Sequence, residues 1–155
     1  MLKPIINPEK YIDVVYDAYN YIEDSYISNN DKAFLATASK LALTSPNRFR
    51  MAAIVVKSGR VLGGDINLNK ISPFTPPNRF STHAEIRAMK VAMRSDPTDS
   101  TIYIARLDAN DEYALARPCA WCVEHMSDMS INRVVYTVDN DTSSAFYLSM
   151  VTWNK

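Results

Sequence analysis

The sequence predicts an α/β protein with three layers, in which helices cover both faces of a mixed central sheet. Two patterns lead to this prediction. Residues 51–56 form a continuous apolar run, which is typical of a strand that is buried on both faces. Residues 101–138 have the order strand, helix, strand, which implies a parallel, right-handed crossover. We therefore expect the first hairpin to be antiparallel and the later strands to be parallel.

Two helices are expected before residue 50. Apolar residues recur at spacings of three and four between positions 12 and 22, which predicts a helix over 8–24. A second helix is expected over 32–44, after the turn-forming residues Asn29-Asn30-Asp31. We divide the chain accordingly into an N-terminal helical extension, 1–30, and a main domain, 31–155. The extension is rich in tyrosine, and its expected role is to cover the sheet or to make an oligomer contact, in preference to stacking on nucleic acid.

The remaining elements follow in order. Ser58-Gly59 should turn the first strand into an antiparallel partner over 61–68. A proline-rich loop, a helix, a strand and a polar loop are then expected over 70–81, 83–94, 101–107 and 108–117. Pro118 should start a helix that runs to about Met129, because proline is favoured in the first turn. A strand over 133–138 comes next. Residues 142–155 are expected to form a short helix and a tail, with little room for a fifth strand.

Length and composition favour one globular domain and argue against several other classes of protein. A chain of 155 residues with 47% hydrophobic residues can bury a core as one domain. Its 17 basic and 17 acidic residues balance, which argues against a broad basic surface for long nucleic acid. No stretch approaches the roughly 20 apolar residues of a membrane helix, and the N-terminus lacks the apolar core of a signal peptide. We expect a cytoplasmic protein.

Two short motifs predict a metal-bound catalytic site. They are His83-Ala84-Glu85 and Pro118-Cys119-Ala120-Trp121-Cys122, which contain the only two cysteines and one of the two histidines. Zinc binds imidazole and thiolate, and a catalytic zinc site keeps three protein ligands and one open position. His83, Cys119 and Cys122 supply three ligands. Glu85, two residues after the histidine, is placed to move protons in the reaction.

Each motif also has a simpler interpretation. The Cys-x-x-Cys pair could be a redox dithiol, although the upstream His-x-Glu has no role there. Thr82 and Glu85 fit a capping box, in which the glutamate would only bind a backbone amide. A closed structural zinc site would need a fourth ligand, which is not evident. His125 is expected to be a surface or packed residue.

Taken together, these motifs resemble the cytidine deaminase superfamily, whose zinc enzymes carry an H-x-E…P-C-x-x-C pattern. The run from Arg50-Met51-Ala52-Ala53 to Tyr136-Thr137 is similar to the deoxycytidylate-deaminase-like proteins common in bacteriophages, over roughly residues 31 to 140. The resemblance implies a cytidine deaminase-like fold, a Zn²⁺ cofactor and Glu85 as the catalytic residue. It also implies that Asn67 binds the substrate sugar and that the backbone N–H of Ala84 faces the base.

We expect hydrolytic deamination of a cytosine nucleotide, from dCMP to dUMP and ammonia. The substrate-binding residues expected are Asn67, with Asn69 as its competitor, and Ala84, Pro118 and Tyr136. Trp121 could stack on a base, but packing is favoured. Four cations flank the expected site and could hold a phosphate: Arg50, Lys70, Arg79 and Arg117. The alternatives are a deaminase of cytosine in single-stranded DNA or RNA, and an inactive zinc-binding interaction module. The resemblance also makes a homo-oligomer an expectation.

Overall fold

A mixed seven-stranded sheet forms the centre of the protein. The computed structural model describes residues 19–24, 26–68, 83–139 and 142–153. The strand order is β2-β8-β7-β5-β3-β4, and β6 pairs with β5. These strands are β2 (Glu23–Asp24), β3 (Arg50–Lys57), β4 (Arg60–Ile66), β5 (Thr101–Leu107), β6 (Tyr113–Ala114), β7 (Arg133–Val138) and β8 (Thr142–Tyr147).

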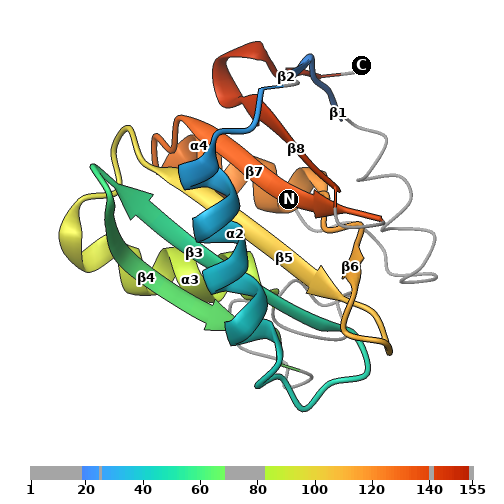
Figure 1. Ribbon diagram of the computed structural model, residues 1–155. Helices are drawn as coiled ribbons and strands as arrows, with labels where there is room; N and C mark the ends of the chain where they lie inside the picture. The colour runs from blue at the N-terminus through green and yellow to red at the C-terminus, as the bar shows by residue number, and fades with distance from the viewer. Residues whose placement is uncertain (1–18, 25, 69–82, 140–141, 154–155) are drawn as a thin grey trace, which may run out of the picture.

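Three helices cover the two faces of this sheet within the described ranges. Helix α2 (Asn29–Ala42) crosses one face, and α3 (Ala84–Ala92) and α4 (Ala120–Asp128) lie on the other (Figure 1). Strands β3 and β4 are antiparallel, and β5 and β7 are parallel. The predicted α/β fold with three layers is therefore confirmed.

The continuous apolar run of β3 is explained by burial on both faces. Ala53 and Val55 belong to the core beneath α3 and α4, and Ile54 and Val56 belong to the core beneath α2. All four are at most 5% exposed. Because successive side chains of a strand point to opposite faces, both faces need apolar residues here.

Glycine allows α3 to lie close to the edge strand β4. A Cβ added at Gly63 would lie 2.7 Å from the Ala92 nitrogen and 2.8 Å from the Ala88 oxygen. Both atoms belong to the backbone of α3, so they cannot move aside independently. Gly63 therefore sets the distance between β4 and the helix that begins at the predicted site.

Two sequence predictions are wrong at the ends of the chain. Residues 142–147 form a full strand, β8, which pairs with β7 along its whole length from Val138↔Thr142 to Arg133↔Tyr147. The expected helix over 8–24 does not include residues 19–24, because these form β1 (Tyr19–Asn20) and β2. Strand β1 pairs with β9 (Thr152–Trp153), and β2 pairs with β8. Residues 8–18 of the expected helix lie outside the described residues.

The helix starts lie one to three residues away from the sequence predictions. Ser28 caps α2 through a capping box with Asp31, so Asn29 already lies inside the helix. The N-cap of α4 is Cys119, and Pro118 precedes the helix. Short 3-10 turns follow α3 at Met93–Ser95 and β8 at Leu148–Met150.

Within the described ranges, no helix combines the length and apolar character that a membrane span requires.

Candidate active site

The start of α3 and the start of α4 meet on the same face of the sheet. His83 is the N-cap of α3, and Cys119 is the N-cap of α4. Cys122 follows at the third residue of α4, so it lies one turn after Cys119. Neither N-cap side chain bonds to its own helix, which leaves both side chains directed at each other.

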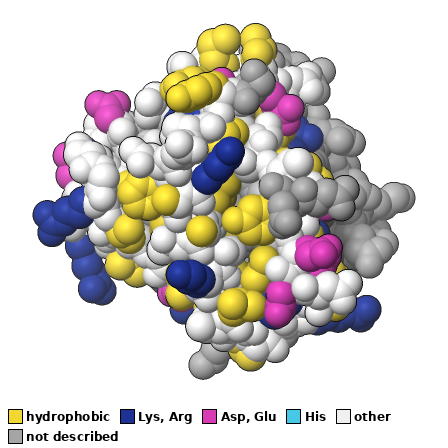
Figure 2. Space-filling model, viewed as in Figure 1, with side chains coloured by type: hydrophobic (Ala, Val, Ile, Leu, Met, Phe, Trp, Pro, Cys, Tyr) yellow, Lys and Arg dark blue, Asp and Glu magenta, His cyan; other side chains and the backbone are white. Residues whose placement is uncertain are grey.

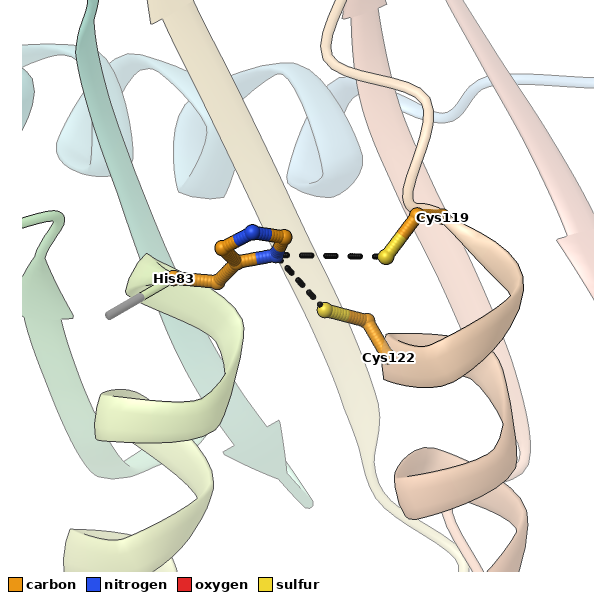
Figure 3. Close-up of side chains that lie close together, drawn as sticks. All are labelled: His83, Cys119 and Cys122. Carbon is orange, nitrogen blue, oxygen red and sulfur yellow. Dashed lines mark hydrogen bonds between the residues drawn. The ribbon is translucent and has the colours of Figure 1, made fainter. Parts of the chain in front are cut away.

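The three side chains converge on one point (Figure 3). His83 Nδ1 lies 3.1 Å from Cys122 Sγ and 3.9 Å from Cys119 Sγ. One donor atom from each residue lies within 4.8 Å of the others. Both thiols are buried and free of disulfides.

The chemistry and spacing of these donors fit a zinc ion. Ligands at about 2.0–2.3 Å from a tetrahedral zinc are about 3.5–3.8 Å apart. The two N–S distances, 3.1 and 3.9 Å, lie on either side of that separation. The positive ends of the α3 and α4 dipoles point towards the sulfur atoms and favour their thiolate form. Among the described residues, this is the one group of three metal-binding side chains.

Glu85 lies beside the ligands and is 3% exposed. Its Oε1 has no hydrogen-bond partner among the described residues. Burial raises the pKa of the Glu85 carboxyl; Cys119 adds to the shift, and His83, the Glu85 amide and Cys122 oppose it. The N-cap of α3 is His83, and Thr82, the other member of the expected capping box, lies outside the described residues. A buried carboxyl oxygen without a partner is costly for stability, which indicates a role other than folding.

Comparison with known protein families agrees with this geometry. Residues 28–138, more than half of the chain, match the model of the cytidine and deoxycytidylate deaminase zinc-binding region. The chain belongs to this family. Its cofactor is Zn²⁺, supported by the family model and by the His/Cys/Cys group. No curated protein matches the chain.

Solved structures with the same fold include a deaminase of the cyanophage S-TIM5. Its dCMP deaminase in the apo form is 24% identical, with a TM-score of 0.56, and the match covers 74% of this chain and 88% of that one. The complex of that enzyme with dCMP and dUMP is 22% identical, with a TM-score of 0.55 and coverage of 72% and 83%. At these identities the likeness concerns the fold.

In this deaminase-family chain, two of the expected substrate-binding residues adjoin the ligands. Ala84 is the first residue of α3, next to His83, and Pro118 directly precedes Cys119. Both are buried. Their contact with a substrate stays a prediction.

Asn67 lies where β4 ends, and its side chain has internal partners. Its Oδ1 accepts hydrogen bonds from Ser45 Oγ and from the Met51 amide, both at 3.0 Å. Its Nδ2 donates to the Phe49 carbonyl at 2.6 Å. These contacts brace the segment before β3, a role that the sequence did not indicate because its partners are distant along the chain. Binding of a sugar by Asn67 stays a prediction, and Asn69 lies outside the described residues.

Tyr136 lies on β7 behind the site and is 1% exposed. Its hydroxyl donates to Glu23 Oε1 at 2.6 Å and lies 2.5 Å from the Tyr21 hydroxyl. Burial raises the pKa of the Tyr136 phenol, and its hydrogen bonds with Glu23 and Tyr21 act in the same direction. Sequence reasoning missed the contacts of Glu23 and Tyr21, because the helical pattern of 8–24 hid β2 and the residues that precede it. A substrate contact by Tyr136 stays a prediction.

The aromatic residue between the two cysteines packs between both histidines. The Trp121 ring lies 5.6 Å from His83 and 4.9 Å from His125, edge to face in both cases. His125 Nδ1 lies 2.9 Å from the Trp121 carbonyl oxygen, so this ring is held within the helix. His125 is not part of the three-residue group, as the sequence predicted.

The four candidate phosphate-binding cations have different surroundings. Arg50 pairs with Asp111 at 2.7 Å and also donates to the Asp108 carbonyl. The guanidinium of Arg117 lies 4.6 Å from the centre of the Tyr21 ring. Lys70 and Arg79 lie outside the described residues.

Proposed function

We propose that this protein is a zinc-dependent hydrolase that deaminates a cytosine nucleotide, converting dCMP to dUMP and ammonia. The observation that carries the proposal is the buried Glu85 carboxyl beside the three-donor group of His83, Cys119 and Cys122. A site with three protein ligands and an adjacent carboxylate is suited to hydrolysis.

The residues of this chain have distinct tasks in the proposed reaction. His83, Cys119 and Cys122 hold the metal, which when bound supplies a Lewis acid that allows water to attack at neutral pH. Glu85 accepts a proton from the attacking water and returns one to the ring nitrogen. Glu85 then takes the second proton, from the hydroxyl now bonded to the ring carbon, and passes it to the amine, so that the C–N bond breaks and ammonia leaves. The Ala84 amide, at the start of α3, faces the base.

A free nucleotide is the favoured substrate for two reasons. The related cyanophage enzyme was crystallised with dCMP and dUMP. The chain also has no net charge. Figure 2 shows the face that carries α2, opposite the site, where basic side chains are interspersed with acidic and apolar ones. A protein that follows a phosphate backbone gains affinity by neutralising several phosphates, which needs a basic stripe.

Two reduced cysteines suit a cytoplasmic enzyme. A homo-oligomer remains an expectation from the family alone.

One observation favours cytosine in single-stranded nucleic acid as a second candidate substrate. Phe49, which directly precedes β3, is 57% exposed. The guanidinium groups of Arg106 and Arg48 lie 5.0 and 5.9 Å from its ring centre. An exposed aromatic ring beside cations is the kind of platform on which bases stack.

A panel of substrates tests these proposals. The purified protein would be incubated with dCMP, deoxycytidine, dAMP and a cytosine-containing single-stranded oligonucleotide, and ammonia release would be measured at two salt concentrations. We expect turnover of dCMP to exceed that of the oligonucleotide at moderate salt. Faster turnover of the oligonucleotide, falling steeply with salt, would select the second candidate. Absence of turnover on all four would favour an inactive zinc-binding module.

A further inference from the structure

We propose that residues 19–24, which precede the matched family region, are part of the catalytic unit. In this proposal Tyr21 and Glu23 are positioning residues that fix the Arg117–Cys119 segment and thereby the metal ligand Cys119. The activity arm of the test below rests on the proposed function, whereas the metal arm does not.

Tyr21 joins the N-terminal segment to the core at two points, Phe146 and Tyr136, and also bonds to Glu23 within the segment. Its ring stacks on Phe146 of β8, with 4.3 Å between ring centres and 27° between planes. Its hydroxyl lies 2.5 Å from the Tyr136 hydroxyl and donates to Glu23 Oε1 at 3.1 Å. Because Tyr136 and Phe146 are at most 1% exposed, Tyr21 is fixed against a rigid part of the core.

The contact that reaches the site is the one with Arg117. The Arg117 guanidinium lies over the Tyr21 ring at 4.6 Å, within the range of a cation–π interaction. Arg117 is followed directly by Pro118, which has a restricted backbone, and then by Cys119. A shift of Arg117 would therefore be transmitted to the sulfur ligand with little loss.

Charge and strand pairing support the same arrangement. Glu23 accepts hydrogen bonds from both Tyr21 and Tyr136. The bond from Tyr136 is the main cause that holds the pKa of Glu23 below its usual value, and Tyr21, Ser144 and Arg117 act in the same direction. Pairing of β2 with β8 fixes the backbone of Glu23 opposite Phe146. Further along, Arg133 binds the Asp24 carboxylate at 3.5 Å and the Tyr26 carbonyl at 2.9 Å. Before Tyr21, β1 pairs with β9, so the segment is held on both sides of Tyr21.

The metal arm of the test compares Tyr21→Leu with Tyr26→Leu. Leucine keeps apolar packing on Phe146 but removes the aromatic face beneath Arg117 and the hydroxyl. Tyr26 is 69% exposed and provides the matched control. Zinc release to a chelator would be measured at a temperature at which all variants are folded, and Co²⁺-loaded protein would be examined for its thiolate charge-transfer band. We expect Tyr21→Leu to release zinc about 10-fold faster and to shift the band, because outer partners of metal ligands contribute about 10–100-fold. Tyr26→Leu should match the wild type.

The activity arm uses the same variants with dCMP. We expect Tyr21→Leu to lower kcat with a smaller change in KM, since the altered geometry concerns the metal and not substrate binding. If Tyr21→Leu fails to fold, Tyr21→Phe replaces it and should show the same changes to a smaller degree. Zinc release and a cobalt spectrum identical to the wild type would overturn the proposal, whatever the activity. If the wild type does not turn over dCMP, the proposed function fails, and the metal arm still decides the role of Tyr21.

Discussion

At the scale of single residues, Glu85 is the side chain whose placement is hardest to explain by folding alone. It is 3% exposed, and its Oε1 finds no hydrogen-bond partner among the described residues. A folded protein normally pairs such an atom, because an unsatisfied buried polar group costs about 1–3 kcal/mol. Its position beside His83 fits the catalytic task that we propose for this carboxyl.

Replacing the carboxyl by an amide tests that task. We expect Glu85→Gln to keep the fold and the zinc, since glutamine has nearly the same shape. Turnover of dCMP should fall by about 10²–10⁴-fold, the usual contribution of a general acid–base group. Steady-state kinetics with metal analysis of the same sample would show this. Near-normal turnover would mean that Glu85 is not catalytic.

The metal ligands could be predicted from sequence because so few soft donors exist in the chain. Two cysteines three residues apart and a histidine that precedes a helix leave few other ligand sets. The hydrogen bonds of Asn67, by contrast, could not be predicted from the sequence. Its partners Ser45 and Met51 lie 22 and 16 residues away. No local pattern of residue types reveals such long-range contacts.

At the scale of elements, the approach of α3 to β4 determines where His83 and Glu85 lie. Gly63 permits this approach, because a Cβ there would meet the helix backbone at 2.7 and 2.8 Å. The strand and helix must separate to accommodate any side chain. The site residues at the start of α3 would move with the helix.

Gly63→Ala should therefore affect both stability and activity. We expect the free energy of unfolding to fall by about 1–3 kcal/mol, the usual cost of overpacking, and dCMP turnover of the folded fraction to fall as well. Urea unfolding and kinetics would measure the two effects. Val61→Ala is the matched control, because Val61 lies on the same strand and is 46% exposed. Equal stability of Gly63→Ala and Val61→Ala would contradict the assigned packing.

Elements with a continuous apolar run, such as β3, were predicted from the sequence. Elements whose conformation depends on pairing with strands distant in the sequence, such as β8 and residues 19–24, were not. In β8, Ala145 and Phe146 are adjacent and both fully buried, because one faces α2 and the other faces α3 and α4. The strand therefore lacks the alternation that would reveal it. In residues 19–24, pairing with β8 and β9 overrides the helical period. Ile22, which that period directs inward, is 66% exposed.

At the scale of the whole molecule, one buried ion pair links the sheet to both α2 and the N-terminal segment. Arg133 on β7 donates to both carboxylate oxygens of Asp31 at 3.0 Å. Tyr103 donates to the same carboxylate at 2.8 Å. Burial acts to raise the pKa of Asp31, but hydrogen bonds from the Ser28 amide, Tyr103 and Arg133 outweigh it and hold the pKa below the usual value.

This lowered pKa predicts the acid sensitivity of the fold. An unfolded aspartate has a pKa of about 3.9, so the stabilisation by Asp31 is complete above that pH and is lost as the pH falls through the lower folded value. We expect Asp31→Asn to be less stable than the wild type at neutral pH by about 1–3 kcal/mol, because Arg133 loses the nearer of its two carboxylate partners and keeps only Asp24 among the described residues. Below about pH 4 the difference should shrink.

Urea unfolding between pH 7 and pH 3 would measure this difference. Asp128→Asn, on the exposed surface of α4, serves as the control and should remain close to the wild type throughout. A constant difference between Asp31→Asn and the wild type across the range would show that the charge of Asp31 is not what stabilises the fold.

The central claim is that His83, Cys119 and Cys122 hold a zinc ion on which deamination depends. The most direct measurement is zinc content and dCMP turnover in one preparation, before chelation, after chelation and after Zn²⁺ is returned. We predict that turnover disappears with the metal and is restored by about one equivalent of zinc per chain, whereas Cys122→Ser neither binds zinc firmly nor regains activity. Full turnover in protein stripped of zinc, or full zinc content in Cys122→Ser, would contradict the account.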